Sequence, residues 1–419
     1  MKIVYLSQYF PPEMGAPAAR VSELARQWAE AGHDVHVVTG FPNHPTGVIP
    51  EGYRGRWRQR ERWQGVEVLR TWVYATPNRG IAKRTLSFLS FAASSVALGV
   101  ADARVRDADV VVATSPQFFC AAAGWALARL IGAPYVLEIR DLWPQCIVEL
   151  GVLPARHPAT RVLEAIEQFL YRSADLLVSV TDAYTQVWRD QGHDPAKMRV
   201  IKNGVDLEAF VPGDKEGPVR ERLSLSGKFV VSYIGTHGMS QHLITLLDAA
   251  SQLRSVPDVH FLFVGEGADK AALVAEAERR GLANVTFLGQ QPRETITDFI
   301  AASDLVAVVL KRMDLFEKVI PSKIFEIMGC ARPILLAVQG EARRIIDEAG
   351  SGYVAEPEDV ADIVAKIQAA RANPEDAAAR GRAGRTYVAE HFDRRRLALR
   401  FLDDLRAVAR GRSVAATRA

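Results

Sequence analysis

The stretch Phe229-Val-Val-Ser-Tyr-Ile-Gly235-Thr-His-Gly238 places a short, mostly apolar run directly before a glycine turn. The chain begins in the same way, because the apolar run Ile3–Leu6 leads into a loop rich in proline and glycine. Continuous Val/Ile/Leu runs that alternate with helical stretches predict a parallel sheet covered by helices on both faces. Because this pattern fills the first half and restarts at Phe229, the sequence predicts two Rossmann-like α/β domains in tandem.

The segment between the two series is a linker by composition, because Pro212–Pro218 holds two prolines, two glycines and three charged residues. A length of 419 residues fits two domains. The expected strands of the first series are Ile3–Leu6, Val35–Val38, Asp109–Ala113, Pro134–Ile139, Leu176–Val180 and Met198–Ile201. Those of the second series are Phe229–Ile234, Val259–Val264, Val285–Leu288, Leu305–Leu310 and Pro333–Ala337.

Composition excludes several classes of protein. With 48% hydrophobic and 24% charged residues, the chain is neither wholly disordered nor a multi-span membrane protein. Its three cysteines lack C-x-x-C spacing, which excludes a disulfide framework and a thiolate zinc site and fits a reducing cytosol. We expect no signal peptide, since Met1-Lys2 runs directly into the first strand.

Two glycine turns in the second half are candidates for binding a phosphate. Gly235–Gly238 follows one expected strand, and Gly265-Glu-Gly267 follows the next. Glycine lets backbone N–H groups approach a phosphate closely. The alternative is a plain strand-to-helix turn, and neither segment is a Walker A motif or a complete G-x-G-x-x-G.

A more specific signal is Lys311-Arg312 followed by Ile320-Pro-Ser-Lys-Ile-Phe-Glu326. We expect a strand to end at Lys311 and a helix to begin at Pro321 or Ser322. Cations at a strand end beside a helix N-terminus suit a diphosphate. A carboxylate at Glu326 could accept hydrogen bonds from a ribose diol. The alternative is a capped helix with a surface glutamate.

Four loops of the first half follow strands and should therefore lie on one rim of the sheet. They are Pro11–Pro17, Thr39–Pro45, Ser115–Gln117 and Glu138–Gln145. The pair Arg140-Asp141 is the most suggestive, because charges at a buried strand end need a reason. It could also be a structural ion pair that braces the rim, and His44 could be an ordinary solvated histidine.

These loops together resemble the family-4 retaining glycosyltransferases of GT-B fold. The matching strings are SQYFPPEMGAPAAR from Ser7, TGFPNHPTG from Thr39, EIRDLWPQ from Glu138, KNGVD from Lys202 and IPSKIFEIMGCARPIL from Ile320. They occur in the family's order over nearly the whole chain. The resemblance is strongest to the bacterial subgroup that builds O-antigen, capsule and colanic-acid-type polysaccharide, including the L-fucosamine transferases.

The resemblance implies that a sugar, which could be an N-acetylated amino sugar, is transferred with retention from a nucleotide-diphosphate donor, with UDP the usual nucleotide. It implies no metal and no other cofactor. The implied acceptor is a polyprenyl-diphosphate-linked glycan. The implied domains are an acceptor-binding domain at 1–206, a nucleotide-sugar-binding domain at 213–392, and a helix and tail at 393–419 that pack on the first domain. The active site would lie in the cleft between the domains.

The resemblance also assigns roles to residues. The implied catalytic residues are Glu13, Arg140, Asp141 and Lys323, and those that contact the acceptor are Asn43 and His44. The implied donor-binding residues are Gly15, Gly235, Thr236, Gly238, Gln290, Lys311, Ser322, Lys323 and Glu326.

The sequence departs from the family pattern at three points. Eight positions before Glu326 lies Lys318, so the E-x7-E motif is broken and Glu317 is one residue off register. Arg140 stands where a histidine is frequent. The phosphate turn GTHGMSQHL lacks the usual Arg or Lys, which makes Lys311 and Lys323 the expected phosphate-binding cations.

The net charge of +3 conceals a basic stretch. Between Glu51 and Thr85 there are nine basic and three acidic residues, with tryptophans interleaved, and the apolar segment Leu86–Ala101 follows. Basic and aromatic residues beside an apolar helix suit an anionic membrane surface. The region 51–101 therefore predicts a cytoplasmic enzyme at the inner face of the cell membrane. The alternative is a core helix preceded by a charged hairpin; nucleic acid is not expected, because no binding module accompanies the stretch.

Two other functions remain open on the sequence. One is a nucleotide-sugar 2-epimerase on the same architecture. The other is a non-catalytic nucleotide-sugar-binding partner of a transferase, which the broken E-x7-E spacing motivates.

Overall fold

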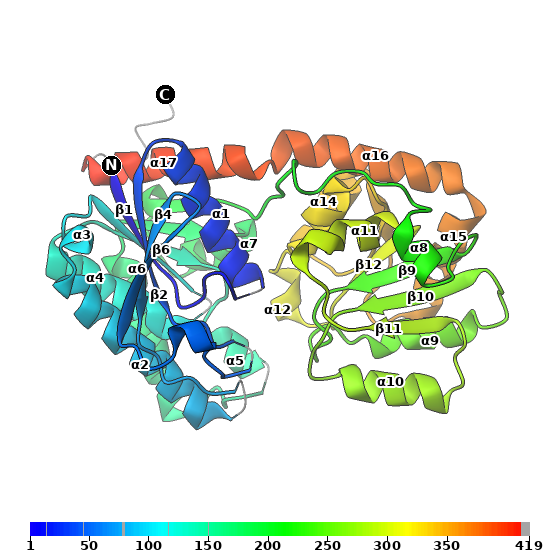
Figure 1. Cartoon of the computed structure of the whole chain (residues 1–419), viewed down its shortest axis with the longest axis horizontal. Coiled ribbons are helices and arrows are strands. Elements are labelled where there is room, and N and C mark those ends of the chain that lie inside the picture. The colour runs from blue at the N-terminus through cyan, green and yellow to red at the C-terminus, as the bar shows by residue number, and fades with distance from the viewer. Residues whose placement is uncertain (14, 45, 78–79, 116, 150, 412–419) are drawn as a thin grey trace. The chain divides into compact units, whose positions relative to one another are not determined.

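The structure is a computed structural model that describes residues 1–13, 15–44, 46–77, 80–115, 117–149 and 151–411. The chain divides into two compact units (Figure 1). Unit 1 comprises Met1–Lys202 and the chain from Arg395 onward, and unit 2 comprises Asn203–Arg394. Each unit is built on a central sheet with helices against it, which confirms the predicted α/β class with two Rossmann-like domains.

Unit 1 contains an eight-stranded sheet among its described residues, in the order β3-β4-β2-β1-β5-β6-β7-β8. The strands are β1 (Lys2–Leu6), β2 (Asp34–Gly40), β3 (Arg58–Trp63), β4 (Val66–Thr71), β5 (Val110–Thr114), β6 (Tyr135–Ile139), β7 (Leu176–Ser179) and β8 (Met198–Val200). The strands expected from the sequence pair in parallel, and the structure adds β3 and β4 at one edge, where β3 pairs antiparallel with β4. Gln64 and Gly65 join these two strands with positive φ angles, as a tight hairpin turn requires.

The edge strand β3 carries the sequence Arg-Gln-Arg-Glu-Arg-Trp, and its residues are exposed or half-buried. Charged residues on an edge strand discourage pairing with another chain. The charged hairpin considered for this segment is therefore present, as an extension of the sheet.

Helices cover both faces of the unit 1 sheet. One face packs against α2 (Ile81–Ala101), α4 (Phe118–Ile131), α6 (Pro158–Ser173) and α7 (Asp182–Asp190). The other packs against α1 (Ala16–Glu30) and α17 (Arg394–Ala409). Shorter elements of this unit are α3 (Ala103–Arg106), α5 (Gln145–Glu149) and the 3-10 helices Glu51–Tyr53 and Pro195–Lys197.

The C-terminal helix α17 is part of the unit 1 core. Phe401 is fully buried and lies edge-on to Trp28, with ring centroids 5.4 Å apart. The indole N–H of Trp28 donates a hydrogen bond of 2.9 Å to the carbonyl of Ala398. The end of the chain thus completes the same hydrophobic layer as α1.

Unit 2 contains a six-stranded sheet among its described residues, in the order β11-β10-β9-β12-β13-β14, and all paired neighbours are parallel. Its strands are β9 (Phe229–Ile234), β10 (Val259–Val264), β11 (Val285–Leu288), β12 (Leu305–Val309), β13 (Ile334–Ala337) and β14 (Gly352–Val354). Its helices are α8 (Pro218–Arg222), α9 (Ile244–Gln252), α10 (Lys270–Arg279), α11 (Ile296–Ala301), α12 (Asp314–Glu317), α13 (Lys323–Gly329), α14 (Glu341–Ala349), α15 (Val360–Ala372) and α16 (Pro374–His391), with a 3-10 helix at Arg293–Thr295. One face of the sheet packs on α9, α10 and α15, and the other on α11, α13, α14 and α16.

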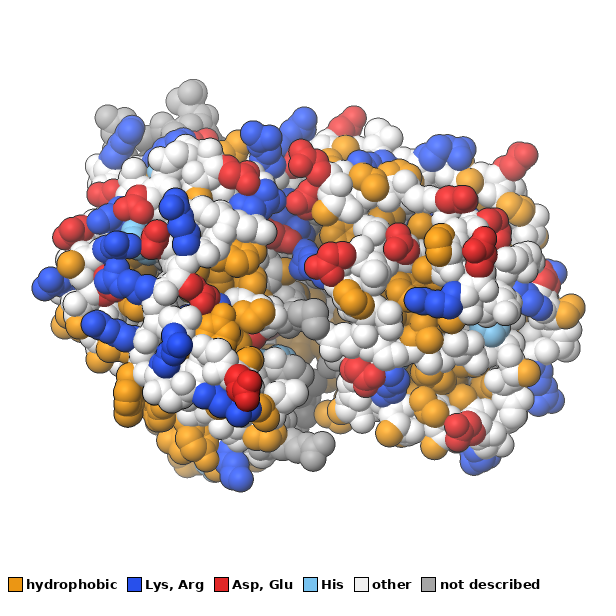
Figure 2. Space-filling view, in the orientation of Figure 1, with side chains coloured by type: hydrophobic (Ala, Val, Ile, Leu, Met, Phe, Trp, Pro, Cys, Tyr) orange, Lys and Arg blue, Asp and Glu red, His pale blue; other side chains and the backbone are white. Residues whose placement is uncertain are grey.

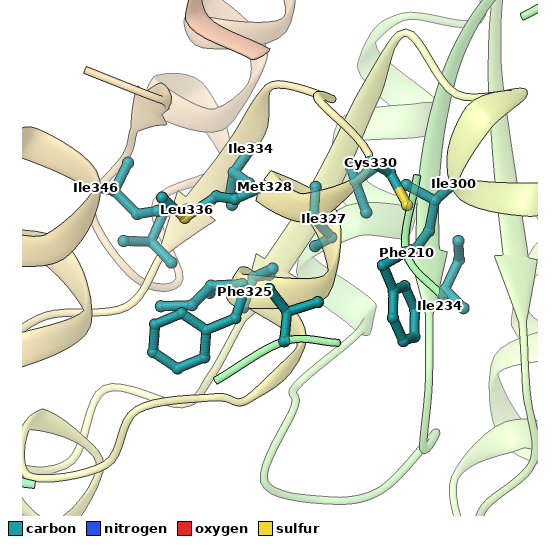
Figure 3. Packing of buried hydrophobic residues seen from close by; sticks show 14 of the residues in the cluster. Phe210, Ile234, Ile300, Phe325, Ile327, Met328, Cys330, Ile334, Leu336 and Ile346 are labelled. Carbon is teal, nitrogen blue, oxygen red and sulfur yellow. The ribbon is translucent and has the colours of Figure 1, made fainter. Parts of the chain in front are cut away.

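Helix α13 is held in place by its apolar side. Phe325, Ile327 and Met328 are buried in the cluster that Figure 3 shows, together with Cys330 and Phe210. Lys323 and Glu326 are half-buried and lie three residues apart, so they share the remaining side of the helix. The helix begins at Lys323, slightly after the predicted start at Pro321 or Ser322. Packing of the apolar side thus fixes where the lysine and the glutamate project.

Candidate functional site

Two glycine turns at the carboxyl ends of β9 and β10 pack directly against each other. The N–H of Gly235 donates to the carbonyl of Val264 at 2.9 Å, and the N–H of His237 donates to that of Glu266 at 2.9 Å. A Cβ on Gly265 would lie 1.9 Å from the carbonyl oxygen of Gly235. Gly235 and Gly265 also have φ angles of +142° and +145°, which other residues rarely adopt. The approach of the two turns therefore requires glycine.

The ammonium group of Lys323 lies at the first of these turns. Its Nζ donates a hydrogen bond of 2.9 Å to the carbonyl of Ile234 and lies 4.1 Å from the centroid of the Tyr233 ring. A Cβ on Gly235 would come within 2.5 Å of the same nitrogen. Burial lowers the pKa of Lys323 to about 8, although Glu326 acts in the opposite direction. A cation from α13 therefore reaches the turn that lacks an Arg or Lys of its own.

The remaining donor-site candidates lie around the same end of the unit 2 sheet. The strand predicted to end at Lys311 ends at Val309, and the N–H of Lys311 donates to the carbonyl of Ser240 at 2.9 Å. This bond ties the segment after β12 to the turn after β9. Thr236 is exposed, its carbonyl accepts from the hydroxyl of Tyr233 at 2.8 Å, and the N–H of Gly238 donates to Oε1 of Gln241 at 3.2 Å.

Three further candidates of unit 2 differ in their surroundings. Ser322 directly precedes α13, and Gln290 is exposed in the loop after β11. The off-register Glu317 is exposed at the end of α12, where its carbonyl lies against Gly340.

Sequence reasoning missed two residues beneath the glycine turns. His237 is fully buried, with its ring centroid 5.8 Å from that of Tyr233 and 6.2 Å from that of Phe263. Neither ring nitrogen has a hydrogen-bond partner among the described residues, and burial lowers the pKa of this histidine to about 4. Lys270 donates to the carbonyls of Gly265 and Leu288, both at 2.9 Å, and so joins the ends of β10 and β11. A histidine between two turn glycines was the only signal available for the first of these residues.

In unit 1, the carboxylate of Glu13 joins the loop after β1 to the loop after β2. Its Oε1 accepts the backbone N–H groups of Asn43 and His44, both at 2.9 Å, and its Oε2 accepts that of Phe10 at 3.4 Å. Burial raises the pKa of Glu13, and these N–H groups oppose the rise. The ring of His44 lies edge-on to that of Tyr9, 5.2 Å away. Glu13 thus holds the loop that carries Asn43 and His44.

Arg140 connects the other loops of this rim. Its backbone N–H donates to the hydroxyl of Ser115 at 3.0 Å, and its guanidinium donates to the carbonyl of Pro17 at 3.4 Å. Gly15, just before Pro17, has a φ of +126° and precedes the first turn of α1. Burial raises the pKa of Asp141, which Arg140 partly offsets. The structure therefore brings Glu13, Asn43, His44, Gly15 and Arg140 onto one connected rim.

Glu138 is a fully buried carboxylate of unit 1 to which sequence reasoning gave no role. Its Oε1 accepts the Nε–H of Arg20 at 2.9 Å and forms an ion pair with Nη2 of the same guanidinium at 2.8 Å. Its Oε2 accepts the hydroxyls of Tyr5 and Thr114, at 2.8 and 2.7 Å. Burial alone would raise the pKa of this carboxyl, but Arg20 and Arg140 hold it below its usual value. A glutamate inside the apolar run Tyr-Val-Leu-Glu-Ile was the signal that could have revealed it.

No group of three or more His, Cys, Asp or Glu side chains that could hold a metal ion occurs within the described part of the chain.

Solved structures with the same fold define the class of the protein. Sucrose-phosphate synthase (tll1590) from Thermosynechococcus elongatus superimposes with a TM-score of 0.75 at 19% identity, covering 98% of this chain and 99% of that one. Anabaena Alr3699/HepE in complex with UDP and glucose superimposes with a TM-score of 0.72 at 19% identity and covers 97% of this chain and 100% of that one. WaaG, a glycosyltransferase involved in lipopolysaccharide biosynthesis, superimposes with a TM-score of 0.69 at 18% identity and covers 96% of this chain and 99% of that one. The chain has the GT-B fold.

Sequence comparison then gives the family. "Glycosyl transferase 4-like domain" matches residues 15–204, and "Glycosyl transferases group 1" matches residues 218–387. The two matches together span most of the chain, and the protein belongs to the group 1 glycosyltransferases. It is therefore an enzyme that transfers a sugar.

Sequence relatives are named as glycosyltransferases, one of them for colanic acid biosynthesis. The chain is 27% identical to the colanic acid biosynthesis glycosyl transferase WcaI of Escherichia coli (strain K12), over 97% of this chain and 100% of the relative. It is 29% identical to the glycosyltransferase WbjE of Pseudomonas aeruginosa, over 67% of this chain and 69% of the relative.

Proposed function

We propose that the enzyme transfers a sugar, with an N-acetylated amino sugar as the first candidate, from a UDP-linked donor to a polyprenyl-diphosphate-linked glycan, with retention at the anomeric carbon. Similarity to relatives named for colanic acid biosynthesis supports the polysaccharide context. A structure of the same fold with UDP and glucose bound supports the choice of nucleotide. The corresponding location is the cytoplasmic face of the cell membrane.

The observation that carries the proposal is the position of Lys323. Its ammonium group lies at the glycine turn after β9, 2.9 Å from the carbonyl of Ile234. A donor diphosphate at this turn would meet that charge together with Lys311, whose backbone is tied to the same loop. Fixed cations that face a leaving group stabilise the negative charge that develops on it in the transition state.

Glu326 shares the half-buried side of α13 with Lys323, and we assign it to the ribose hydroxyls of the nucleotide. Its carboxylate can accept two hydrogen bonds from a diol, while Lys323 one turn earlier meets the phosphates. The loop after β11, with Gln290, would lie against the base. Gly235, Thr236, Gly238 and Ser322 would lie along the diphosphate, which the glycine turns allow to approach the backbone closely.

The bond between the anomeric carbon and the diphosphate oxygen breaks, and the acceptor oxygen forms a bond on the same face of the sugar. The acceptor's proton passes to the departing diphosphate. The rim of unit 1 then positions the acceptor. Glu13 holds the backbone of Asn43 and His44, which we assign to the acceptor, and we assign Arg140 and Asp141 to the reacting groups.

Titration calorimetry with UDP and UDP-sugars tests the donor site. Glu326→Ala and Lys323→Met should each raise the dissociation constant about tenfold to a hundredfold, because each removes hydrogen bonds to a charged or buried group. Glu317→Ala is the matched control, since this exposed glutamate of the same segment stands outside the assigned set. Unchanged binding in the first two variants would refute the assignment of the donor site. If incubation with the donor alone forms its epimer, the enzyme is an epimerase and the proposed transfer is wrong.

Thermal-shift measurements with UDP-, GDP- and TDP-sugars identify the nucleotide, because a ligand that binds the folded state raises the apparent stability. The proposal expects the largest shift with a UDP-sugar. A larger shift with GDP- or TDP-sugars would overturn the choice of UDP while leaving the transferase assignment in place.

A further inference from the structure

The outward side of helix α2 is apolar beyond its first turn, which carries the exposed Lys83 and Arg84. Ala82, Leu86, Leu89, Ala93 and Ala97 recur at helical spacing and are all exposed. Leu86 keeps 50% and Leu89 45% of its surface in solvent. A surface helix of a globular protein usually directs charged and polar residues outward. Between Leu86 and Ala101 this helix contains no charged residue, so its outer side has the reverse polarity.

The serines of α2 point inward. Ser87 and Ser95 are buried, and the hydroxyl of Ser90 accepts the backbone N–H of Tyr74 at 2.8 Å. Ser94 donates to the carbonyl of Trp72. These bonds satisfy the serines inside unit 1 and leave alanine and leucine for the outside. The pattern differs from a core helix, because only 22% of the apolar window Ala82–Ala101 is buried.

Aromatic and basic side chains border this apolar side. Trp57 is 70% exposed, and its ring lies 5.2 Å from that of Trp72, the residue whose carbonyl binds α2. Figure 2 shows hydrophobic side chains gathered over α2 at the lower left of the molecule, with Lys and Arg side chains close by. The exposed cations of this border are Arg54, Arg56, Arg58, Lys83 and Arg84.

We infer that the outer side of α2 and the segment Arg54–Arg58 form a docking surface for an anionic lipid bilayer, in which α2 lies along the interface. Leu86, Leu89 and Trp57 would enter the boundary between headgroups and acyl chains, while the arginines and Lys83 meet lipid phosphates. Helix α2 does not span the bilayer, because its opposite side packs on unit 1, where Phe91 is fully buried in the core. A second copy of the chain is the less favourable occupant, because two such cationic borders would repel each other.

Co-sedimentation with vesicles of phosphatidylethanolamine and phosphatidylglycerol tests this surface. The full chain should bind these vesicles, and the double variant Leu86→Glu/Leu89→Glu should bind at least about tenfold more weakly, because two apolar side chains no longer enter the lipid. Val162→Glu is the matched control, since Val162 is 58% exposed on α6 of the same unit. Circular dichroism and the melting temperature verify that the variants fold.

The cationic border is tested separately. Arg54→Ser/Arg56→Ser/Arg58→Ser should weaken binding about fivefold for each charge removed, and the difference should shrink on phosphatidylcholine vesicles and at high salt. The fluorescence of the wild type should shift to shorter wavelength on binding, and Trp57→Phe should remove most of this shift.

Three results would overturn the inference. They are failure of the wild type to bind vesicles, equal losses for Val162→Glu and the α2 variant, and a change of oligomeric state in the α2 variant without loss of vesicle binding. None of these readouts uses the sugar donor, so they are independent of the proposed reaction.

Discussion

The two units present the same end of the same kind of sheet, yet they build it with different chemistry. In unit 1 carboxylates hold the rim together, with Glu13 and Glu138 each accepting several hydrogen bonds. In unit 2 the rim is made of glycine turns in close backbone contact and of lysine ammonium groups. Carboxylates repel an incoming diphosphate, whereas lysines and backbone N–H groups attract it. Tandem copies of one architecture can thus be specialised for two different ligands by the residues that follow their strands.

The largest effect should come from breaking the carboxylate network of unit 1. Arg20→Met leaves Glu138 charged, fully buried and without its guanidinium partner, which should lower the stability of unit 1 by about 3–5 kcal/mol. Arg26→Met is the control, because both side chains of the Arg26–Glu30 pair reach solvent, so the pair should contribute below about 1 kcal/mol. Chemical denaturation of the full chain, followed by tryptophan fluorescence, measures both. Equal losses would show that the buried pair does not organise the rim.

A methyl group on a unit 2 turn tests the backbone contact in the same way. In Gly265→Ala the new Cβ meets the carbonyl of Gly235 at 1.9 Å and is strained by the φ of +145°. We expect a loss of about 3 kcal/mol in stability and a loss of donor binding, since the turns must separate. Gly281→Ala has a φ of +63° with no atom within 4 Å of the added methyl, so it should cost only about 1 kcal/mol. Equal losses of stability in Gly265→Ala and Gly281→Ala would show that the close contact of the two turns does not require glycine at position 265.

The two units were predictable from sequence because their signals are local. Short apolar runs such as Phe229–Ile234 and Val259–Val264 identify buried parallel strands without reference to any distant residue. The hairpin of β3 and β4 was harder to place, because Arg-Gln-Arg-Glu-Arg-Trp reads as a charged surface segment whether or not it joins the sheet. Whether β3 joins the sheet depends on its pairing with β4 and not on its own composition.

The site was less predictable, because its decisive contacts join residues far apart in the chain. Lys323 was identified as a phosphate cation, but its bond to Ile234 spans 89 positions. The pair of Arg20 and Glu138 spans 118 positions, and Arg20 carried no signal in its own helix. Sequence analysis assigned roles to Arg140 and Asp141 but none to Glu138, the buried carboxylate two residues before Arg140.

A smaller effect should appear in the pH dependence of donor binding. The pKa of Lys323 is lowered to about 8 by burial, so the ammonium form is lost as the pH rises through 8. Donor affinity should fall up to about tenfold between pH 7 and pH 9, measured by titration calorimetry. Lys323→Arg should abolish this dependence, because arginine stays protonated throughout the range. If the wild-type affinity is flat up to pH 9, the charge that meets the diphosphate lies elsewhere.

The smallest effect should come from His237, which lies buried under the unit 2 turns without a hydrogen-bond partner among the described residues. Replacing a buried, unpaired polar ring by an apolar side chain removes a desolvation cost, so His237→Leu should change stability by less than about 1 kcal/mol at pH 7, or raise it. His260→Leu is the matched control, since it breaks a hydrogen bond of 2.9 Å to Thr286 and should destabilise unit 2.

The pH dependence of stability sharpens this comparison. The folded pKa of His237 is about 4, below the ordinary value of 6.5, so the unfolded chain binds the proton more tightly. The wild type should therefore lose stability as the pH falls from 6.5 towards 4, and His237→Leu should lose less over the same window. Denaturant titrations at several pH values measure the difference. A steep dependence retained in His237→Leu would show that this histidine does not control acid stability.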